Sequence, residues 1–192
     1  MRLTGQRIAG TGRQSAYDPG YSMSNRRRAL ILRQSHTLRH VPPIMAWDYP
    51  HPFTLPLVPM ADDIDGLNHT NNGVYCRWCE QIAWTQSEKF GLSLADYQRL
   101  DRAMAIRRGE YDYLLPTLLG DRLTLATWLF AGKGKLTLER RFQLMRDRDQ
   151  ATMLRGRWEL ICIELSSGRA RRMPPEFIHA YSPAIVNPAP AP

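Results

Sequence analysis

The sequence lacks the features that mark several large classes of protein. No apolar run in its 192 residues approaches the roughly 20 that a helix needs to cross a bilayer, so we expect a soluble protein without a membrane partner. Its three cysteines, Cys76, Cys79 and Cys162, are too few and odd in number for a disulfide framework. This favours reduced thiols and a cytoplasmic location.

Two motifs of enzyme chemistry are missing as well. No Gly-x-Ser-x-Gly segment occurs, and Cys76 and Cys79 fall inside a predicted helix, so a serine or cysteine triad is not expected. No second Cys or His pair accompanies Cys76-x-x-Cys79 to complete a zinc site. We interpret both cysteines as small helix residues and expect neither a metal nor an organic cofactor.

Positive charge is concentrated at one end of the chain. The formal net charge is +8, yet residues 1–44 hold eight Arg and one acidic residue, a net of +7. Residues 45–192 hold 18 Lys and Arg against 17 Asp and Glu, a net of +1. Because the larger part of the chain is nearly neutral, we expect no nucleic-acid partner.

Composition divides the chain into three parts. Residues 1–44 have little periodic apolar pattern, which predicts a basic, disordered extension; a transit peptide and a start at Met45 are alternative interpretations. Residues 182–192 end in Asn-Pro-Ala-Pro-Ala-Pro, which predicts a disordered tail. Residues 45–181 are then expected to form a single domain.

Hydrophobic periodicity predicts an α+β domain. Phe53–Met60 is extended but interrupted by two prolines, as in a first or edge strand. Asn72–Phe90 is predicted as a helix with one apolar half, and Ser93–Leu100 as a shorter helix capped by Ser93. Alternating apolar residues predict four further strands, joined by short connections into a largely antiparallel sheet: Met104–Leu114, Arg122–Ala131, Lys135–Arg146 and Thr152–Glu164.

The stretch from Asp62 to Glu80 carries the residues of greatest chemical interest. Asp63, Asp65 and His69 lie in a polar, turn-forming run directly before the long helix. The first turn of a helix has backbone N–H groups without partners, and these favour an anion or a developing oxyanion. A carboxylate just upstream can face a carbonyl bound there, which is the layout of an acyl-transfer or hydrolysis site.

Several motifs follow one another in a fixed order: Asp63-Ile-Asp65, His69-Thr-Asn71-Asn72, Tyr75 with Glu80, and Tyr113-Leu-Leu-Pro116 followed by Gly120-Asp121. This order resembles the signature of hotdog-fold acyl-CoA thioesterases, the 4-hydroxybenzoyl-CoA thioesterase-like family. The resemblance covers about Phe53 to Pro174. It departs at Asn68, where the family often has Gly, although Asn tolerates a positive φ better than most residues.

The resemblance implies a hotdog fold, in which an antiparallel sheet of about five strands wraps one long central helix. It implies hydrolysis of an acyl-CoA thioester to free acid and CoA, with Asp65 as general base or nucleophile. We expect the oxyanion hole at the helix N-terminus near Asn72, and contacts to the substrate from Asn71, Gly73 and Tyr75. Neither the acyl group nor a preference for CoA over acyl-carrier protein is specified.

Assembly is a further implication of the resemblance. Members of the family join two sheets so that each site is completed by the partner, which implies a homodimer or homotetramer here. Trp84 stands alone on the polar half of the predicted helix, and we expect it to contact the partner.

Other roles stay open for the remaining polar residues. Glu80 is the second choice for the catalytic carboxylate, against an ion pair with Arg77 or a subunit contact. Asp63 is interpreted as a structural loop residue. His69 could orient the substrate or act with Asp65 in an enoyl-thioester hydratase, and a non-catalytic acyl-binding protein is another alternative. Seven arginines are possible CoA phosphate ligands: Arg140, Arg141, Arg155, Arg157, Arg169, Arg171 and Arg172.

Overall fold

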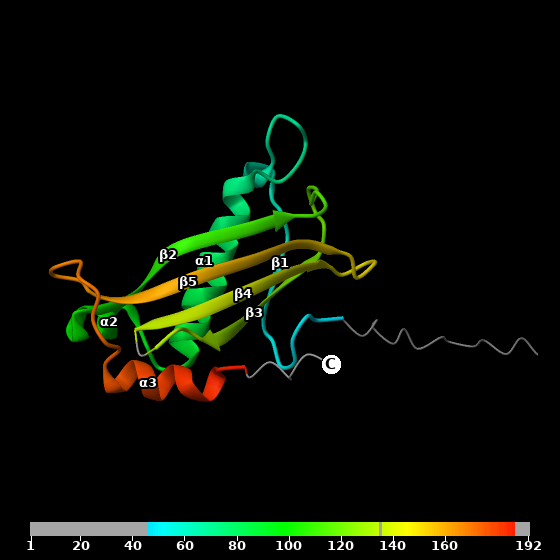
Figure 1. Cartoon of the computed structure of the whole chain (residues 1–192). Coiled ribbons are helices and arrows are strands. Elements are labelled where there is room, and N and C mark those ends of the chain that lie inside the picture. Colours follow the sequence, from blue (N-terminus) through cyan, green and yellow to red (C-terminus); the bar gives the residue numbers. More distant parts are fainter. Residues whose placement is uncertain (1–45, 135, 187–192) are drawn as a thin grey trace, which may run out of the picture. The chain divides into compact units, whose positions relative to one another are not determined.

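A computed structural model describes residues 46–134 and 136–186. In these residues one antiparallel sheet packs against a long helix, as expected from the sequence (Figure 1). The strands lie in the order β1-β3-β4-β5-β2. Their bounds are β1 (Phe53–Leu57), β2 (Arg102–Tyr113), β3 (Leu123–Ala131), β4 (Thr137–Arg146) and β5 (Thr152–Glu164).

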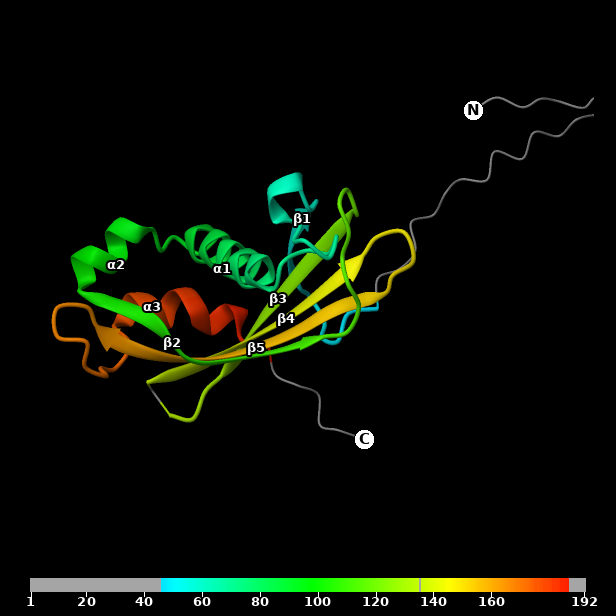
Figure 2. The same ribbon diagram turned by 90° about the horizontal axis from the view of Figure 1, so that it is seen from above.

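The helices cover one face of the sheet. They are α1 (Asn72–Lys89), α2 (Leu94–Leu100) and α3 (Pro175–Tyr181), and Figure 2 shows all three on the same side. The predicted apolar half of α1 is buried at Val74, Tyr75, Trp78, Cys79 and Ile82, while Ala83 and Phe90 are half-buried against the same core. Burial of this face provides the main stabilisation of the helix, since apolar area removed from water contributes about 25 cal/mol per Å².

A glycine in β5 allows the core to close. Gly156 pairs with Tyr111 on one side and Phe142 on the other, and a Cβ at this position would lie 3.2 Å from both aromatic rings. The two rings therefore approach the backbone more closely than a larger residue at this position would allow. Ser93 caps α2 through a hydrogen bond from the Asp96 N–H to Ser93 Oγ, also as predicted.

Two features at the C-terminal end differ from the prediction. Helix α3 was not predicted, and it buries Phe177 and Tyr181 beneath α2. The tail expected from Ser182 is partly ordered, because Ser182–Ala184 forms a 3₁₀ turn and the Val186 N–H donates to the Leu129 carbonyl at 2.7 Å. The hydrogen bond to Leu129 fixes this part of the chain, although its composition predicts disorder. Residues 187–192 and the predicted extension lie outside the described residues.

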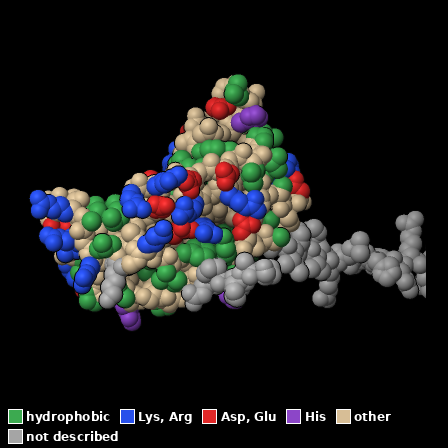
Figure 3. All heavy atoms as spheres, in the orientation of Figure 1, with side chains coloured by type: hydrophobic (Ala, Val, Ile, Leu, Met, Phe, Trp, Pro, Cys, Tyr) green, Lys and Arg blue, Asp and Glu red, His purple; other side chains and the backbone are tan. Residues whose placement is uncertain are grey.

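The sheet face turned away from α1 is ionic. Figure 3 shows Lys and Arg side chains mixed with Asp and Glu across its middle. Arg157 pairs there with Glu110, Glu139 and Glu159, and Arg155 forms two hydrogen bonds with Asp48. Beside them, Tyr49 packs edge-on against Trp128 and Phe130. The segment before β1 thus covers part of this face.

Among the described helices, none has both the length and the apolar character needed to span a membrane.

Candidate functional site

The loop before α1 is fixed at its start by Asp63. Its Oδ2 accepts the Met60 N–H at 2.9 Å, and its Oδ1 pairs with Arg77 of α1. The Asp63 carbonyl accepts the Asn71 N–H at 2.9 Å, which places the residue that caps α1. The hydrogen bond to nearby backbone that was predicted for Asp63 is present. Arg77 is used in this contact, and the proposed ion pair between Arg77 and Glu80 is not formed.

Asp65 closes the turn that follows. Its Oδ1 accepts the Leu67 N–H at 2.8 Å and the His69 N–H at 3.3 Å, while the Asp65 N–H donates to the His69 carbonyl at 2.8 Å. Asn68 lies between them with a φ of 61°, the positive value for which the family often uses Gly. One carboxylate oxygen therefore orients the side chain, and Oδ2 accepts no hydrogen bond within the described residues.

A buried threonine holds the loop in place through hydrogen bonds. Thr117, in the connection between β2 and β3, is fully buried. Its Oγ1 lies 2.6 Å from Thr70 Oγ1 and 2.9 Å from the Tyr75 hydroxyl, and its carbonyl accepts the Thr70 N–H at 3.0 Å. Thr117 thus joins the loop, helix α1 and the β2–β3 connection, which contains the second predicted motif. The Tyr75 hydroxyl is engaged in this network.

The N-terminus of α1 offers one unpaired donor. Asn71 is the N-cap, and its Oδ1 accepts the Gly73 N–H at 2.8 Å. A Cβ at Gly73 would lie 3.3 Å from that oxygen, so glycine suits this close cap. The Val74 N–H donates to the Asn71 carbonyl at 2.9 Å. Within the described residues this leaves the Asn72 N–H without a partner, as the first turn of a helix allows.

These residues surround a cavity of ≈ 270 Å³, which we call the loop cavity. It brings together four of the predicted site residues with exposed apolar side chains of the β2–β3 connection. Its lining consists of Asp65, Leu67, His69, Thr70, Asn72, Tyr75, Tyr113, Leu114, Leu115 and Pro116. Asn71 and Gly73 do not line it, because they form the cap described above.

Glu80 lies elsewhere. It is eight residues beyond Asn72, about 12 Å along the helix axis. There it lines a second cavity of ≈ 250 Å³ between α1 and the sheet, which we call the sheet cavity. The lining consists of Glu80, Ala83, Trp84, Ser87, Tyr97, Ala103, Met104, Ile106, Leu129, Leu138, Arg140, Trp158, Leu160 and Tyr181. Trp84 is 44% exposed, as predicted, and its ring packs against Tyr97.

The seven arginines differ in their surroundings, which the sequence did not distinguish. Arg140 is buried beside the sheet cavity, away from solvent, and this argues against contact with a CoA phosphate. Arg141, Arg155 and Arg157 pair with carboxylates on the ionic face, and Arg171 pairs with Glu164. Arg169 and Arg172 are exposed and form no ion pair within the described part of the chain.

None of the three cysteines lines the loop cavity or the sheet cavity. Cys76 and Cys79 lie within α1, as predicted, and Cys79 is fully buried. Burial raises the pKa of the Cys79 thiol well above its ordinary value, so the thiol stays protonated at neutral pH.

Comparison with known proteins agrees with this architecture. A family model described as the thioesterase-like superfamily matches residues 58–181. A 1,4-dihydroxy-2-naphthoyl-CoA thioesterase from Synechocystis superposes with a TM-score of 0.63 at 17% identity, covering 69% of this chain and 96% of its own. A hypothetical protein from Staphylococcus aureus in complex with CoA gives 0.65 at 18%, covering 73% and 90%. Among curated proteins no significant match is found.

The name of a further structural match gives ACP in place of CoA as the carrier of the acyl group. The 12:0-ACP thioesterase from Umbellularia californica superposes with a TM-score of 0.64 at 13% identity, covering 71% of this chain and 54% of its own. At such identities these matches establish a shared fold.

Proposed function

Because the chain belongs to the thioesterase-like superfamily and has the hotdog fold, we propose that it hydrolyses an acyl-CoA thioester to the free acid and CoA. The reaction takes place in the loop cavity. Asp65 is the catalytic carboxylate, and the N-terminus of α1 at Asn72 binds the oxyanion. The CoA-bound Staphylococcus aureus relative supports CoA as the carrier.

One observation carries this proposal. Asp65 and Asn72 line the same cavity, and within the described residues the Asp65 Oδ2 accepts no hydrogen bond and the Asn72 N–H donates none. Asp65 Oδ1 is held by two backbone N–H groups, so the free Oδ2 needs little reorganisation before reaction. The Asn72 N–H stands where the positive end of the α1 dipole favours the charge that develops on a thioester oxygen.

Hydrolysis of the thioester then follows one of two routes. Asp65 either removes a proton from a water molecule that attacks the thioester carbon, or attacks that carbon itself to give an anhydride that water cleaves. In both routes the C–S bond breaks, the acyl oxygen passes through an oxyanion, and CoA leaves as the thiol. His69 is exposed at the cavity and can orient the incoming thioester.

We propose a homodimer or homotetramer as the active form. The loop cavity is bordered by large apolar side chains, with Leu67 77% exposed and Leu114 and Leu115 each close to half exposed. Clusters of exposed large apolar side chains often mark a contact with another protein chain. Strand β2 lies at the sheet edge and can join a second copy, near the exposed Trp84. Sedimentation that shows a fully active monomer at assay concentration would contradict this.

The test of the function is CoA release from a panel of aliphatic and aromatic acyl-CoA thioesters, with hydration of crotonyl-CoA measured on the same protein. We expect CoA release without hydration. Hydration without CoA release would instead indicate the enoyl-thioester hydratase, and binding without either reaction would indicate a non-catalytic acyl-binding protein. Matched acyl-carrier-protein thioesters in the panel decide between the two carriers.

A further inference from the structure

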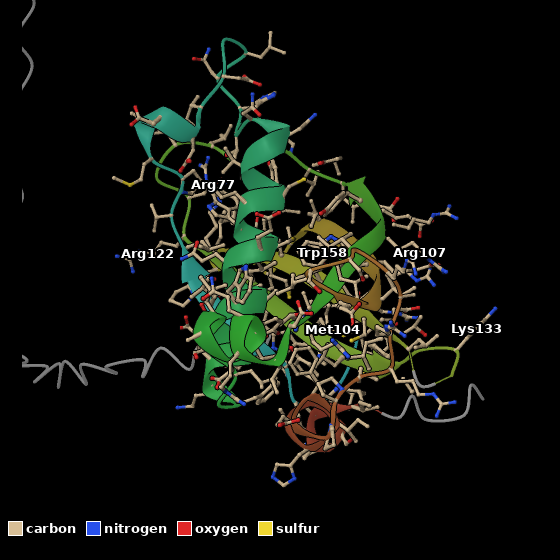
Figure 4. The ribbon with its side chains drawn as sticks, turned by 90° about the vertical axis from the view of Figure 1, so that its left-hand side faces the viewer. Arg77, Met104, Arg107, Arg122, Lys133 and Trp158 are labelled. Atoms are coloured by element: carbon tan, nitrogen blue, oxygen red, sulfur yellow. The ribbon has the colours of Figure 1, made fainter. Side chains whose placement is uncertain are left out.

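A third cavity, of ≈ 480 Å³, opens beside the start of β1, and we call it the β1 cavity. Four parts of the chain line it: residues 50–53, the end of α1, the middle of β3 and residues 183–186. Strands β1 and β2 form opposite edges of the sheet. Figure 4 shows Met104 and Trp158, which line the sheet cavity, on the side of α1 that faces β2. The β1 cavity therefore lies at the sheet edge opposite to the one at which we place a second subunit.

The side chain of Gln86 is oriented by its contact with Arg140. Gln86 of α1 is 5% exposed, and its Oε1 lies 2.5 Å from Arg140 Nη1. A guanidinium only donates hydrogen bonds, so the oxygen of the amide faces Arg140 and the nitrogen faces away. Within the described residues this nitrogen donates no hydrogen bond, and the only enclosed side-chain polar atoms without a partner are Arg140 Nε and Gln150 Oε1. The Gln86 nitrogen is therefore accessible, and of the loop, sheet and β1 cavities Gln86 lines only the last.

The other polar side chains that line the β1 cavity differ from Gln86. Thr127 Oγ1 donates to the Arg141 carbonyl at 3.0 Å, and Trp128 Nε1 donates to the Pro50 carbonyl at 3.0 Å, so the donors of both side chains are used. His51 is exposed to solvent. Among the described residues no Lys, Arg, Asp or Glu lines the cavity. The Gln86 amide is therefore its one buried side-chain donor available to a ligand, and the lining offers no counter-charge to a charged one.

Arg140 strengthens this donor. Burial lowers the pKa of Arg140 only to about 10, so the guanidinium keeps its positive charge at neutral pH. Its hydrogen bond to the Gln86 oxygen draws electron density from the amide, and consecutive hydrogen bonds polarise one another in an interior of low dielectric constant. The Gln86 nitrogen is thus suited to a strong neutral acceptor, such as a carbonyl oxygen.

We propose that the β1 cavity binds a neutral small molecule with an aromatic body and a carbonyl oxygen, and that the Gln86 amide nitrogen donates to this oxygen. Phe53, Phe90 and Trp128 line the cavity together with three prolines, and aromatic side chains pack well against a ligand ring. A mostly apolar cavity of several hundred Å³ with few polar groups is the usual form of a small-molecule site. No residue of the loop cavity takes part, so this site goes beyond the proposed function.

Titration of the full chain with acetophenone and with ethylbenzene, followed by ¹H–¹⁵N NMR, tests the site. The two molecules share a carbon skeleton, and only acetophenone has a carbonyl oxygen. We expect acetophenone to bind about 10-fold more tightly, the scale of one buried hydrogen bond, and to shift the side-chain amide signal of Gln86. The proposal would be overturned by equal affinities, by binding that leaves this signal unchanged, or by no binding of acetophenone at millimolar concentration.

A substitution of Gln86 then locates the binding. Gln86→Glu removes the donor but keeps an acceptor for Arg140, whose buried charge gains a partner, so we expect the variant to fold and to lose the preference for acetophenone. The matched control is Gln81→Glu, the same change at an exposed position of α1, which should leave both affinities unchanged. If Gln86→Glu folds and still prefers acetophenone as the wild type does, the assignment to Gln86 is wrong. If that variant does not fold, the two affinities and the Gln86 signal of the wild type still decide.

Discussion

The two cavities along α1 are built in different ways. The loop cavity is formed by backbone groups and half-exposed side chains, and its ionisable residues, Asp65 and His69, have access to water. The sheet cavity is formed largely by side chains of the core, and of its two charged residues Glu80 is exposed whereas Arg140 is buried and forms no ion pair within the described residues. The first arrangement favours chemistry on an atom that enters from solvent.

The largest expected effect is a loss of CoA release when the carboxylate of the loop cavity is changed, but not when that of the sheet cavity is changed. Asp65→Asn keeps the size of the side chain and removes the charge, so kcat should fall by about 10²–10⁴ with KM little changed. Glu80→Gln, the same change in the sheet cavity, should leave kcat within a few-fold. Steady-state CoA release from one acyl-CoA measures both variants. Near-normal turnover in Asp65→Asn together with loss in Glu80→Gln would place the reaction in the sheet cavity.

A second, smaller effect concerns the support of the loop cavity. Thr117→Val keeps the shape of the side chain but removes the hydroxyl shared by Thr70 and Tyr75. We expect a loss of about 1–3 kcal/mol in unfolding free energy and a several-fold lower kcat. Thr124→Val is the control, because it removes a half-buried hydroxyl that bonds to Asp147 far from the loop. Urea unfolding and steady-state CoA release measure both variants. Equal effects of the two substitutions would mean that Thr117 has no special role in supporting the loop cavity.

The sequence predicted the loop cavity better than the sheet cavity for a physical reason. The loop residues follow one another along the chain, and turns and helix caps depend on local sequence, so Asp65 and Asn72 could be placed near one helix end. The predicted helix Asn72–Phe90 differs from α1 by one residue at its end. The sheet cavity depends on contacts distant in sequence, such as Arg140 with Gln86 and Tyr97 with Tyr181. Such contacts leave no local pattern.

One signal for the sheet cavity was nevertheless present. Leu138, Phe142 and Leu144 alternate along the predicted strand Lys135–Arg146, and position 140 belongs to the same face. Arg140 was instead grouped with six other arginines as a possible CoA phosphate ligand, although arginine is seldom buried without a partner. Its position in this alternation predicts its burial better than its residue type does. Helix α3, whose Tyr181 lines the cavity, is only seven residues long and begins at the second of two consecutive prolines, and so was not predicted.

A third effect tests whether the other acidic residue of the loop acts through structure. Asp63→Asn keeps most of the hydrogen bond from the Met60 N–H but removes the ion pair with Arg77, whose side chain is 62% exposed. Exposed pairs contribute about 0–1 kcal/mol, so we expect a small loss of stability and nearly unchanged kcat. Thermal unfolding and CoA release measure this. A fall in kcat comparable with that of Asp65→Asn would require a shared role for the two carboxylates.

The smallest expected effect concerns the N-terminal segment. Deletion of residues 1–44 should leave stability and turnover unchanged, because this segment has no apolar pattern suited to burial. Circular dichroism and CoA release on the shortened chain measure this. An insoluble or inactive product would mean that the segment packs against the domain.

The most direct test of the assignment to the loop cavity is the rate of CoA release by Asp65→Asn at saturating acyl-CoA, measured beside Asp63→Asn. If Asp65 is the catalytic carboxylate, the rate of Asp65→Asn falls by about 10²–10⁴ while Asp63→Asn keeps nearly the rate of the wild type. A rate of Asp65→Asn within a few-fold of the wild type would contradict the account.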